Sequence, residues 1–173
     1  CGACGFRMDE GRLRPVDEPL AHPDDVAWFD LFAPADDEEK ALEAILGVDV
    51  PTRDEMVEIE DSSRLYVDQG AIYMTATLPT KADSGFPVPA PATFILTGGR
   101  LVTVRYDEAR AFRTFPDRAE RLDLGCTDGT SIFLALLDAI VERLADLLEE
   151  AARSVEALSR EIFRRGAERD DRE

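Results

Sequence analysis

Residues 130–165 read TSIFLALLDAIVERLADLLEEAARSVEALSREIFRR, and they carry the strongest periodic pattern in the chain. Apolar residues recur there at alternating steps of four and three, at Leu137, Val141, Leu144, Leu148, Ala151, Val155, Leu158 and Ile162. This heptad seam predicts one continuous helix with a narrow apolar edge. At a rise of about 1.5 Å per residue the helix would be roughly 50 Å long, more than a domain of this size requires. We therefore expect it to continue toward another part of the protein or to pack against another chain.

The first half of this helix has a wider apolar stripe than the second half. Phe133, Leu136, Ile140 and Leu147 add to the seam in the first half, whereas the second half keeps the seam alone. A wide stripe is typical of a helix that packs on a core, and a narrow one of a helix that pairs with other helices. We expect the first half to lie on a sheet and the second half to need a partner helix.

The middle of the chain predicts an antiparallel meander. Stretches rich in β-branched and aromatic residues predict strands at 64–68, 71–78, 92–97 and 101–106. Gly70 and the pair Gly98-Gly99 fall where hairpin turns belong. The Pro-rich segment 86–91 is expected to form an extended surface loop. Residues 108–122 predict a helix that is interrupted or restarted near Pro116.

The N-terminal part predicts a buried strand followed by two short helices. The strand is expected at 27–32 and the first helix at 36–46. Thr52 and Glu55 have the spacing of a capping box, which predicts the second helix. Before the strand we expect little order, apart from a short edge strand at 11–16.

These elements together predict an α+β, α/β/α-like fold. A mixed, largely antiparallel sheet would be flanked by short helices and followed by a long C-terminal stalk helix. The predicted division is a poorly ordered segment or edge strand (1–23), an α/β domain (24–125) and the start of the stalk helix (126–173).

The composition indicates a folded domain whose natural partners are cations. The chain has 173 residues, 45% of them hydrophobic, which is enough for one ordinary domain with a core. Its 37 acidic and 20 basic residues give a net charge of −17. Nucleic acid is therefore not an expected partner, because phosphate binding needs a positive surface. Bound counter-ions would relieve the repulsion among so many carboxylates.

The cysteines and the histidine do not complete a recognisable metal or disulfide pattern. Cys1, Cys4 and Cys126 are too few for a disulfide framework, which favours a reducing compartment. Cys1 and Cys4 form a C-x-x-C, but structural zinc needs a second ligand pair, and His22 is the one histidine. We therefore expect an unstructured terminus rather than a zinc site.

No catalytic motif assembles in the sequence, so we expect no enzyme. It has no Gly-rich phosphate loop and no G-x-S-x-G elbow. A metal-dependent hydrolase that uses the acidic clusters stays open as an alternative, and it would need carboxylates that converge on one point. The longest apolar runs also fall short of the roughly 20 residues needed to cross a bilayer.

The order of several short motifs resembles one known family. They are Trp28-Phe29-Asp30-Leu31, the acidic helix 36–46 with Gly47-Val48, residues 51–56 (PTRDEM), residues 59–66 (IEDSSRLY), Tyr73-Met74-Thr75, and residues 137–142 (LDAIVE). In this order and spacing, the chain from about residue 27 to 163 resembles the cytoplasmic domain of CorA and ZntB divalent-cation transporters. The Gly-Met-Asn tripeptide of that family does not occur in these residues, and neither does a membrane helix. We expect an excised part of a longer transporter, whose long helix would lead to the missing membrane helices.

The resemblance implies a function and a set of residues. It implies a cation-sensing and assembly domain of a homo-pentameric transporter at the cytoplasmic face of the inner membrane. Mg²⁺ is the expected ion, with Zn²⁺ or Co²⁺ as alternatives. Asp54 and Glu55 match the positions that hold a regulatory ion between neighbouring subunits, and Asp138 and Glu142 are further candidates by residue type.

Two simpler interpretations stay open beside this one. Asp54 and Glu55 also suit a helix start, where they need no metal because the cap and the dipole favour negative charge there. The domain could likewise be a purely structural oligomerisation scaffold of the same transporter, without a regulatory ion. The identity of the transported ion cannot be predicted from this part of the chain, because selectivity belongs to the pore.

Overall fold

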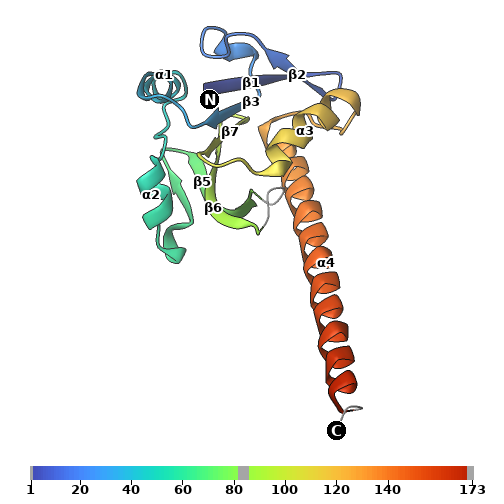
Figure 1. Ribbon diagram of the computed structural model, residues 1–173. Coiled ribbons are helices and arrows are strands. Elements are labelled where there is room, and N and C mark those ends of the chain that lie inside the picture. The colour runs from blue at the N-terminus through green and yellow to red at the C-terminus, as the bar shows by residue number, and fades with distance from the viewer. Residues whose placement is uncertain (1, 82–85, 171–173) are drawn as a thin grey trace.

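A seven-stranded sheet with helices on both faces forms the body of the protein, and one long helix projects from it (Figure 1). The computed structural model describes residues 2–81 and 86–170. The strands are β1 (Gly2–Asp9), β2 (Arg12–Val16), β3 (Trp28–Phe32), β4 (Leu65–Asp68), β5 (Ala71–Thr80), β6 (Val88–Thr97) and β7 (Arg100–Arg105). The helices are α1 (Asp36–Leu46), α2 (Arg53–Glu58), α3 (Arg110–Arg121) and α4 (Gly129–Asp170), with short 3-10 turns at Pro23–Asp25 and Asp61–Ser63.

The sheet is mixed and largely antiparallel, as the sequence predicts. Its strand order is β2-β1-β3-β7-β6-β5-β4. In the described residues β3 and β7 pair in parallel, and the other neighbours pair antiparallel. The predicted meander is confirmed as β4 to β7. At its last turn Gly98 and Gly99 have φ of 53° and 75°, the left-handed values that a tight two-residue hairpin requires.

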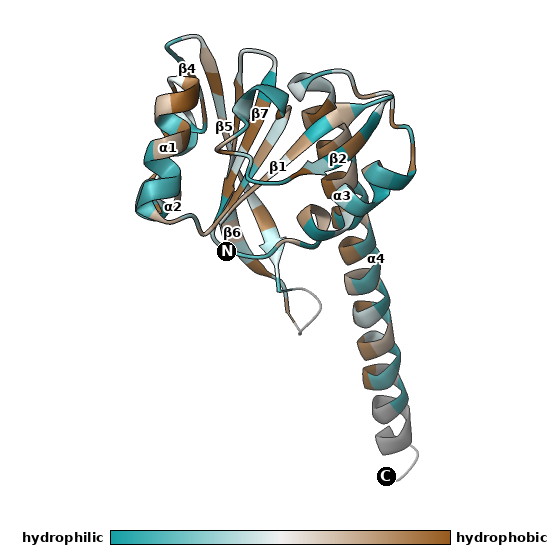
Figure 2. Ribbon diagram, turned by 90° about the horizontal axis from the view of Figure 1, so that it is seen from above, coloured by the Kyte–Doolittle hydropathy of each residue, from teal (hydrophilic) through white to brown (hydrophobic). Residues whose placement is uncertain are grey.

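The core consists of two apolar clusters, one on each face of the sheet. Consecutive residues of a strand point to opposite faces, so Trp28 belongs to one cluster and Phe29 to the other. The first cluster packs under α3 and the start of α4, and the second under α1 and α2 (Figure 2). The result is a three-layer α/β/α arrangement in which α2 and α4 lie on opposite sides of the sheet.

The prediction of little order before residue 11 is wrong. β1 is an interior strand that pairs with β2 on one side and β3 on the other. Its small residues are weak strand formers, so the strand depends on its neighbours rather than on its own propensity. Phe6 stacks on Trp28 with ring centroids 4.7 Å apart. The predicted edge strand at 11–16 is confirmed as β2, whereas Cys1 lies outside the described residues and its role stays a prediction.

The Pro-rich segment is not a loop from Val88 onward. β5 and β6 stay paired out to Thr80 and Val88, and Pro79 faces Pro89 in this register. β7 pairs with β6 only from Ala92 onward, so the outer part of the hairpin is a two-stranded arm. Proline is tolerated there because the outer edges of such an arm need no backbone donor.

The predicted interruption near Pro116 is also wrong, because α3 is assigned as one helix that contains it. Proline removes one backbone hydrogen bond from a helix interior. The apolar face of α3 compensates for this loss, since Phe112, Phe115 and Ala119 are all buried in the core.

A buried ion pair joins the two parallel strands. Arg105 Nη2 donates to Asp30 Oδ2 at 2.8 Å, and both side chains are 8% exposed. Thr103 Oγ1 donates to Asp30 Oδ1 at 2.7 Å, and Trp28 Nε1 donates to Thr103 Oγ1 at 3.0 Å. The Arg105 guanidinium also lies 4.7 Å from the ring centroid of Phe112 on α3. The pair therefore fixes the β3–β7 register next to the helix that supports α4.

Candidate cation site and the exposed seam of the long helix

The start of α4 is fixed tightly to the sheet. Ser131 N donates to Asp128 Oδ1 at 2.8 Å, a side-chain cap that satisfies one free donor of the helix start. This backbone hydrogen bond, together with one from the Ser131 side chain, lowers the pKa of Asp128. Gly129 N donates to Gly99 O at 2.7 Å. A side chain at Gly129 would collide with the backbone of Arg100, so this position admits only glycine.

The first part of α4 is buried, as its wide apolar stripe predicts. Ile132, Phe133, Leu136 and Ile140 belong to the core cluster shared with α3 and the sheet. Glu142 still contacts α3 through Arg118, and farther along its length the helix leaves the domain and extends alone (Figure 1).

The seam in the second part of α4 is exposed. Its apolar side chains are Val141 (61% exposed), Leu144 (38%), Leu148 (72%), Val155 (67%), Leu158 (64%) and Ile162 (68%). They follow one edge of the helix as a brown stripe in Figure 2. Ion pairs within α4 link charged residues on its polar side, among them Glu156 and Arg160 at 3.1 Å. These side chains are exposed in the single chain, and the predicted partner helix for this half stays a prediction.

Asp54 and Glu55 lie at the start of α2, where Glu55 completes a capping box. Glu55 N donates to Thr52 Oγ1 at 3.4 Å, and Glu55 Oε2 accepts from Thr52 N at 2.8 Å. Hydrogen bonds from the Thr52 backbone and side chain lower the pKa of Glu55. Asp54 is exposed beside it. The capping role is thus present in the geometry, and a metal-binding role stays a prediction.

Asp138 and Glu142 lie one turn apart on α4 and are both exposed. Glu142 Oε2 accepts from Arg118 Nη1 of α3 at 2.9 Å. Since α2 and α4 lie on opposite sides of the sheet, one chain does not bring Asp54 and Glu55 to Asp138 and Glu142 (Figure 1). In the described part of the chain, no three His, Cys, Asp or Glu side chains are close enough to hold a metal ion. A site that uses both pairs would require two chains.

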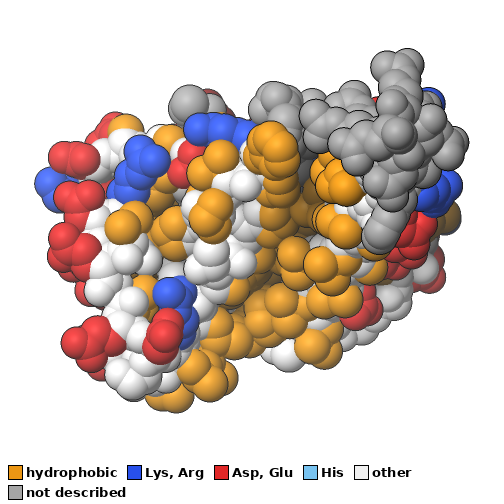
Figure 3. Space-filling model, turned by 60° about the horizontal axis from the view of Figure 1, so that its bottom comes forward, with side chains coloured by type: hydrophobic (Ala, Val, Ile, Leu, Met, Phe, Trp, Pro, Cys, Tyr) orange, Lys and Arg blue, Asp and Glu red, His pale blue; other side chains and the backbone are white. Residues whose placement is uncertain are grey.

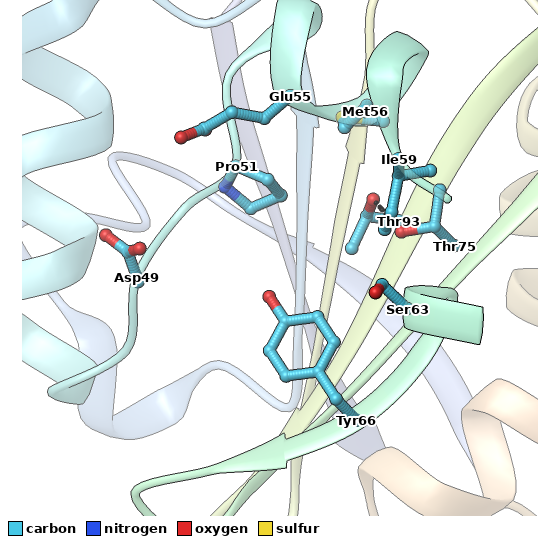
Figure 4. Close-up of a pocket in the computed structure, with 9 residues that line it drawn as sticks. All are labelled: Asp49, Pro51, Glu55, Met56, Ile59, Ser63, Tyr66, Thr75 and Thr93. Carbon is cyan, nitrogen blue, oxygen red and sulfur yellow. Dashed lines mark hydrogen bonds between the residues drawn. The ribbon is translucent and has the colours of Figure 1, made fainter. Parts of the chain in front are cut away.

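A cavity of about 260 Å³, which the sequence did not predict, lies beside α2 (Figure 4). Asp49, Glu55 and Tyr66 are among the residues that line it. Tyr66 stacks on Tyr73 with ring centroids 4.6 Å apart, and Asp49 N donates to Tyr73 Oη at 2.9 Å. Burial, and then repulsion from Glu43 and Glu55, raises the pKa of Asp49. The Tyr pair could have been found, because the Gly70 turn places Tyr66 opposite Tyr73 in the β4–β5 register.

No helix within residues 2–81 and 86–170 combines the length and the apolar content that a bilayer crossing demands.

Comparison with solved structures supports the same architecture. The complete CorA magnesium transporter from Methanocaldococcus jannaschii superposes with a TM-score of 0.71 at 14% identity, covering 94% of this chain and 51% of that chain. The ZntB cytoplasmic domain from Vibrio parahaemolyticus superposes with a TM-score of 0.55 at 14% identity, covering 87% of this chain and 64% of that one. At these identities the likeness establishes the fold alone.

Comparison of sequences establishes the relationship. The chain is 32% identical over 171 residues to the magnesium transport protein CorA of Pectobacterium atrosepticum, covering 96% of this chain and 54% of that protein. The CorA of Haemophilus influenzae is 28% identical over 158 residues, with 50% of its length covered. The chain thus spans about half the length of the curated relatives it matches. The family described as CorA-like Mg²⁺ transporter protein matches residues 23–173, and this chain belongs to that family.

Proposed function

We propose that this chain is the cation-sensing and assembly domain of a CorA-type Mg²⁺ transporter. The exposed seam of α4 is the observation that carries the proposal. A heptad edge with Leu148 72% exposed and Ile162 68% exposed is unfavourable in water unless other helices cover it. Copies of the same helix are suitable partners for such a repeat. In a homo-pentamer with the five α4 helices around the central symmetry axis, each seam would be covered by neighbouring helices.

The face from which α4 projects supports assembly as well. Hydrophobic side chains gather there beside the helix, while the acidic side chains lie toward the outer parts of the view (Figure 3). Apolar surface near the axis and charge at the rim is the usual division of an oligomer interface.

Cations between subunits would account for the charge and for the place of α2. Asp54 and Glu55 are exposed on one side of the domain, and Asp138 and Glu142 on the other. Neighbouring copies in a ring would place these opposite sides against each other. A divalent ion with oxygen ligands would then hold together carboxylates that otherwise repel. Mg²⁺ suits such ligands better than Zn²⁺ or Co²⁺, for which imidazole or thiolate ligands are preferred.

The rest of the transporter is part of the proposal. The relatives are about twice as long as this chain. The membrane-spanning helices would follow α4, and the domain would lie at the cytoplasmic face of the inner membrane. Loss of the bound cation would loosen the contacts between copies and so shift the α4 helices that lead to the pore.

Native mass spectrometry and sedimentation of this chain with and without millimolar Mg²⁺ test the proposal. We expect Mg²⁺ to increase the oligomeric fraction, and Leu148→Glu to abolish it while leaving the unfolding of the monomer unchanged. Asp54→Asn should remove the Mg²⁺ response, whereas Glu58→Gln, on the same exposed helix, serves as its matched control. If the oligomeric fraction changes neither with Mg²⁺ nor with Asp54→Asn, the purely structural scaffold is favoured. A monomer under all conditions, insensitive to Leu148→Glu, would contradict the role of the seam.

A further inference from the structure

The cavity beside α2 has a composition that differs from the rest of the acidic surface. It lies on the sheet face opposite α4, between α2 and strands β4 to β6 (Figure 4). Pro51, Met56 and Ile59 form an apolar wall. A cavity of about 260 Å³ holds roughly nine non-hydrogen atoms, if each takes the volume of one liquid water.

Hydroxyl groups form part of the polar lining. Thr75 and Thr93 lie side by side on β5 and β6, with their Oγ1 atoms 2.8 Å apart, and Thr93 is only 1% exposed. One of the two hydroxyls donates to the other, so the pair keeps lone pairs that can accept from a bound molecule. In Figure 4 the Tyr66 hydroxyl points toward the side of the cavity where Asp49 lies.

The lining carries negative charge and an aromatic ring. Asp49 and Glu55 contribute carboxylates, and the residues described as lining the cavity include no Lys, Arg or His. Tyr66 contributes its ring, held in place by the parallel stack on Tyr73 with an interplanar angle of 3°. Burial and then its neighbours Tyr73 and Asp49 raise the pKa of the Tyr66 hydroxyl.

We propose that this cavity binds the ammonium group of a small organic amine, with Asp49 and the ring of Tyr66 as its main contacts. Carboxylate, hydroxyl and aromatic groups together are what an alkylammonium ion requires, because it has three donors and attracts a π face. The apolar wall would receive the methylene chain. A bare divalent ion suits the cavity less well, because it takes six or more oxygen ligands and Glu55 Oε2 already accepts from Thr52. The proposal concerns one chain and is independent of assembly.

Isothermal titration of the whole chain with 1,4-diaminobutane, at constant ionic strength, tests this proposal. Saturable binding is expected for the amine and not for 1,4-butanediol, its neutral counterpart. Asp49→Asn should weaken binding about tenfold, as the loss of a charge-assisted hydrogen bond predicts. Tyr66→Leu should weaken it roughly threefold through loss of the cation–π contact. Glu58→Gln, which removes one negative charge from the same exposed helix without lining the cavity, should bind like the parent chain.

Three other results would each contradict the proposal. Absence of saturable heat with the parent chain excludes an amine site. Equal weakening by Glu58→Gln and Asp49→Asn would show a response to net charge rather than to the cavity. Stronger binding of MgCl₂ than of the amine, lost in Asp49→Asn, would make the cavity a metal site. Circular dichroism of each variant tests whether it is folded. If Asp49→Asn does not fold, Tyr66→Leu still tests the proposal independently.

Discussion

The two halves of α4 carry the same apolar seam and have opposite surroundings. Leu136, which widens the apolar stripe in the first half, is 0% exposed, whereas Leu148, in the seam of the second half, is 72% exposed. The seam therefore predicts that a helix forms but not what covers it. The width of the apolar stripe distinguishes the halves, because additional apolar residues occur only where the helix packs on its own domain. One half contributes to the stability of the chain, and the other is available for contacts between chains.

The largest expected effect comes from comparing a buried ion pair in the sheet with an exposed ion pair on the second half of α4. Arg105→Met should lower the free energy of unfolding by about 3–5 kcal/mol, because it leaves the Asp30 carboxylate buried without its partner. Arg160→Met, in an exposed pair on the second half of α4, should cost less than about 1 kcal/mol. Urea unfolding followed by the fluorescence of Trp28, which is fully buried and the only tryptophan, measures both.

A double variant separates the pair from the packing around it. Asp30→Leu combined with Arg105→Met removes both charges and should lose less stability than Arg105→Met alone. If the double variant loses as much as the single variant, the arginine acts through its contacts with Phe32 and Phe112 rather than through the ion pair.

A smaller effect compares the two halves directly. Leu136→Ala should destabilise the chain by about 3 kcal/mol, because it opens a cavity in the core. Leu148→Ala should change the free energy of unfolding of the monomer by less than about 0.5 kcal/mol, because its side chain is already in water. Both are measured by urea unfolding at protein concentrations low enough to keep the chain monomeric. A large loss from Leu148→Ala under those conditions would mean that the second half folds back onto the domain.

Most of the fold could be predicted because local signals agreed with the final packing. The capping pair Thr52 and Glu55, the Gly98-Gly99 turn and the long seam each act within a few residues or along one helix. The errors have a different origin. β1 is ordered by pairing with residues 12–16 and 28–32, and the proline arm is ordered by pairing of β5 with β6. Such long-range pairing outweighs weak local propensity and cannot be predicted from a short stretch of sequence.

The site was less predictable than the fold for the same reason. The short motif at 51–56 predicted α2 and its capping box with Glu55, and the structure confirms both, but the motif does not show whether Asp54 and Glu55 also bind a metal ion. No sequence pattern marked Asp49 as a residue that lines a cavity, because its surroundings come from α1, α2 and two strands. Whether Asp138 or Glu142 meets α2 depends on a second chain, and a single sequence carries no direct measure of that contact.

The smallest effect concerns the cap that starts the buried half of α4. The hydrogen bonds from Ser131 lower the pKa of Asp128 below its ordinary value of 3.8, so the folded state favours the carboxylate. Its contribution is therefore complete above pH 3.8 and is lost as the pH falls through the lowered value. Asp128→Asn still caps the helix but does not titrate, so its unfolding free energy should fall less steeply with acid, by less than about 1 kcal/mol. Asp138→Asn, exposed in the same helix and away from its start, is the matched control and should keep the parent slope. If both variants flatten the slope equally, the acid sensitivity arises from the general negative charge of the chain rather than from the anchored start of α4.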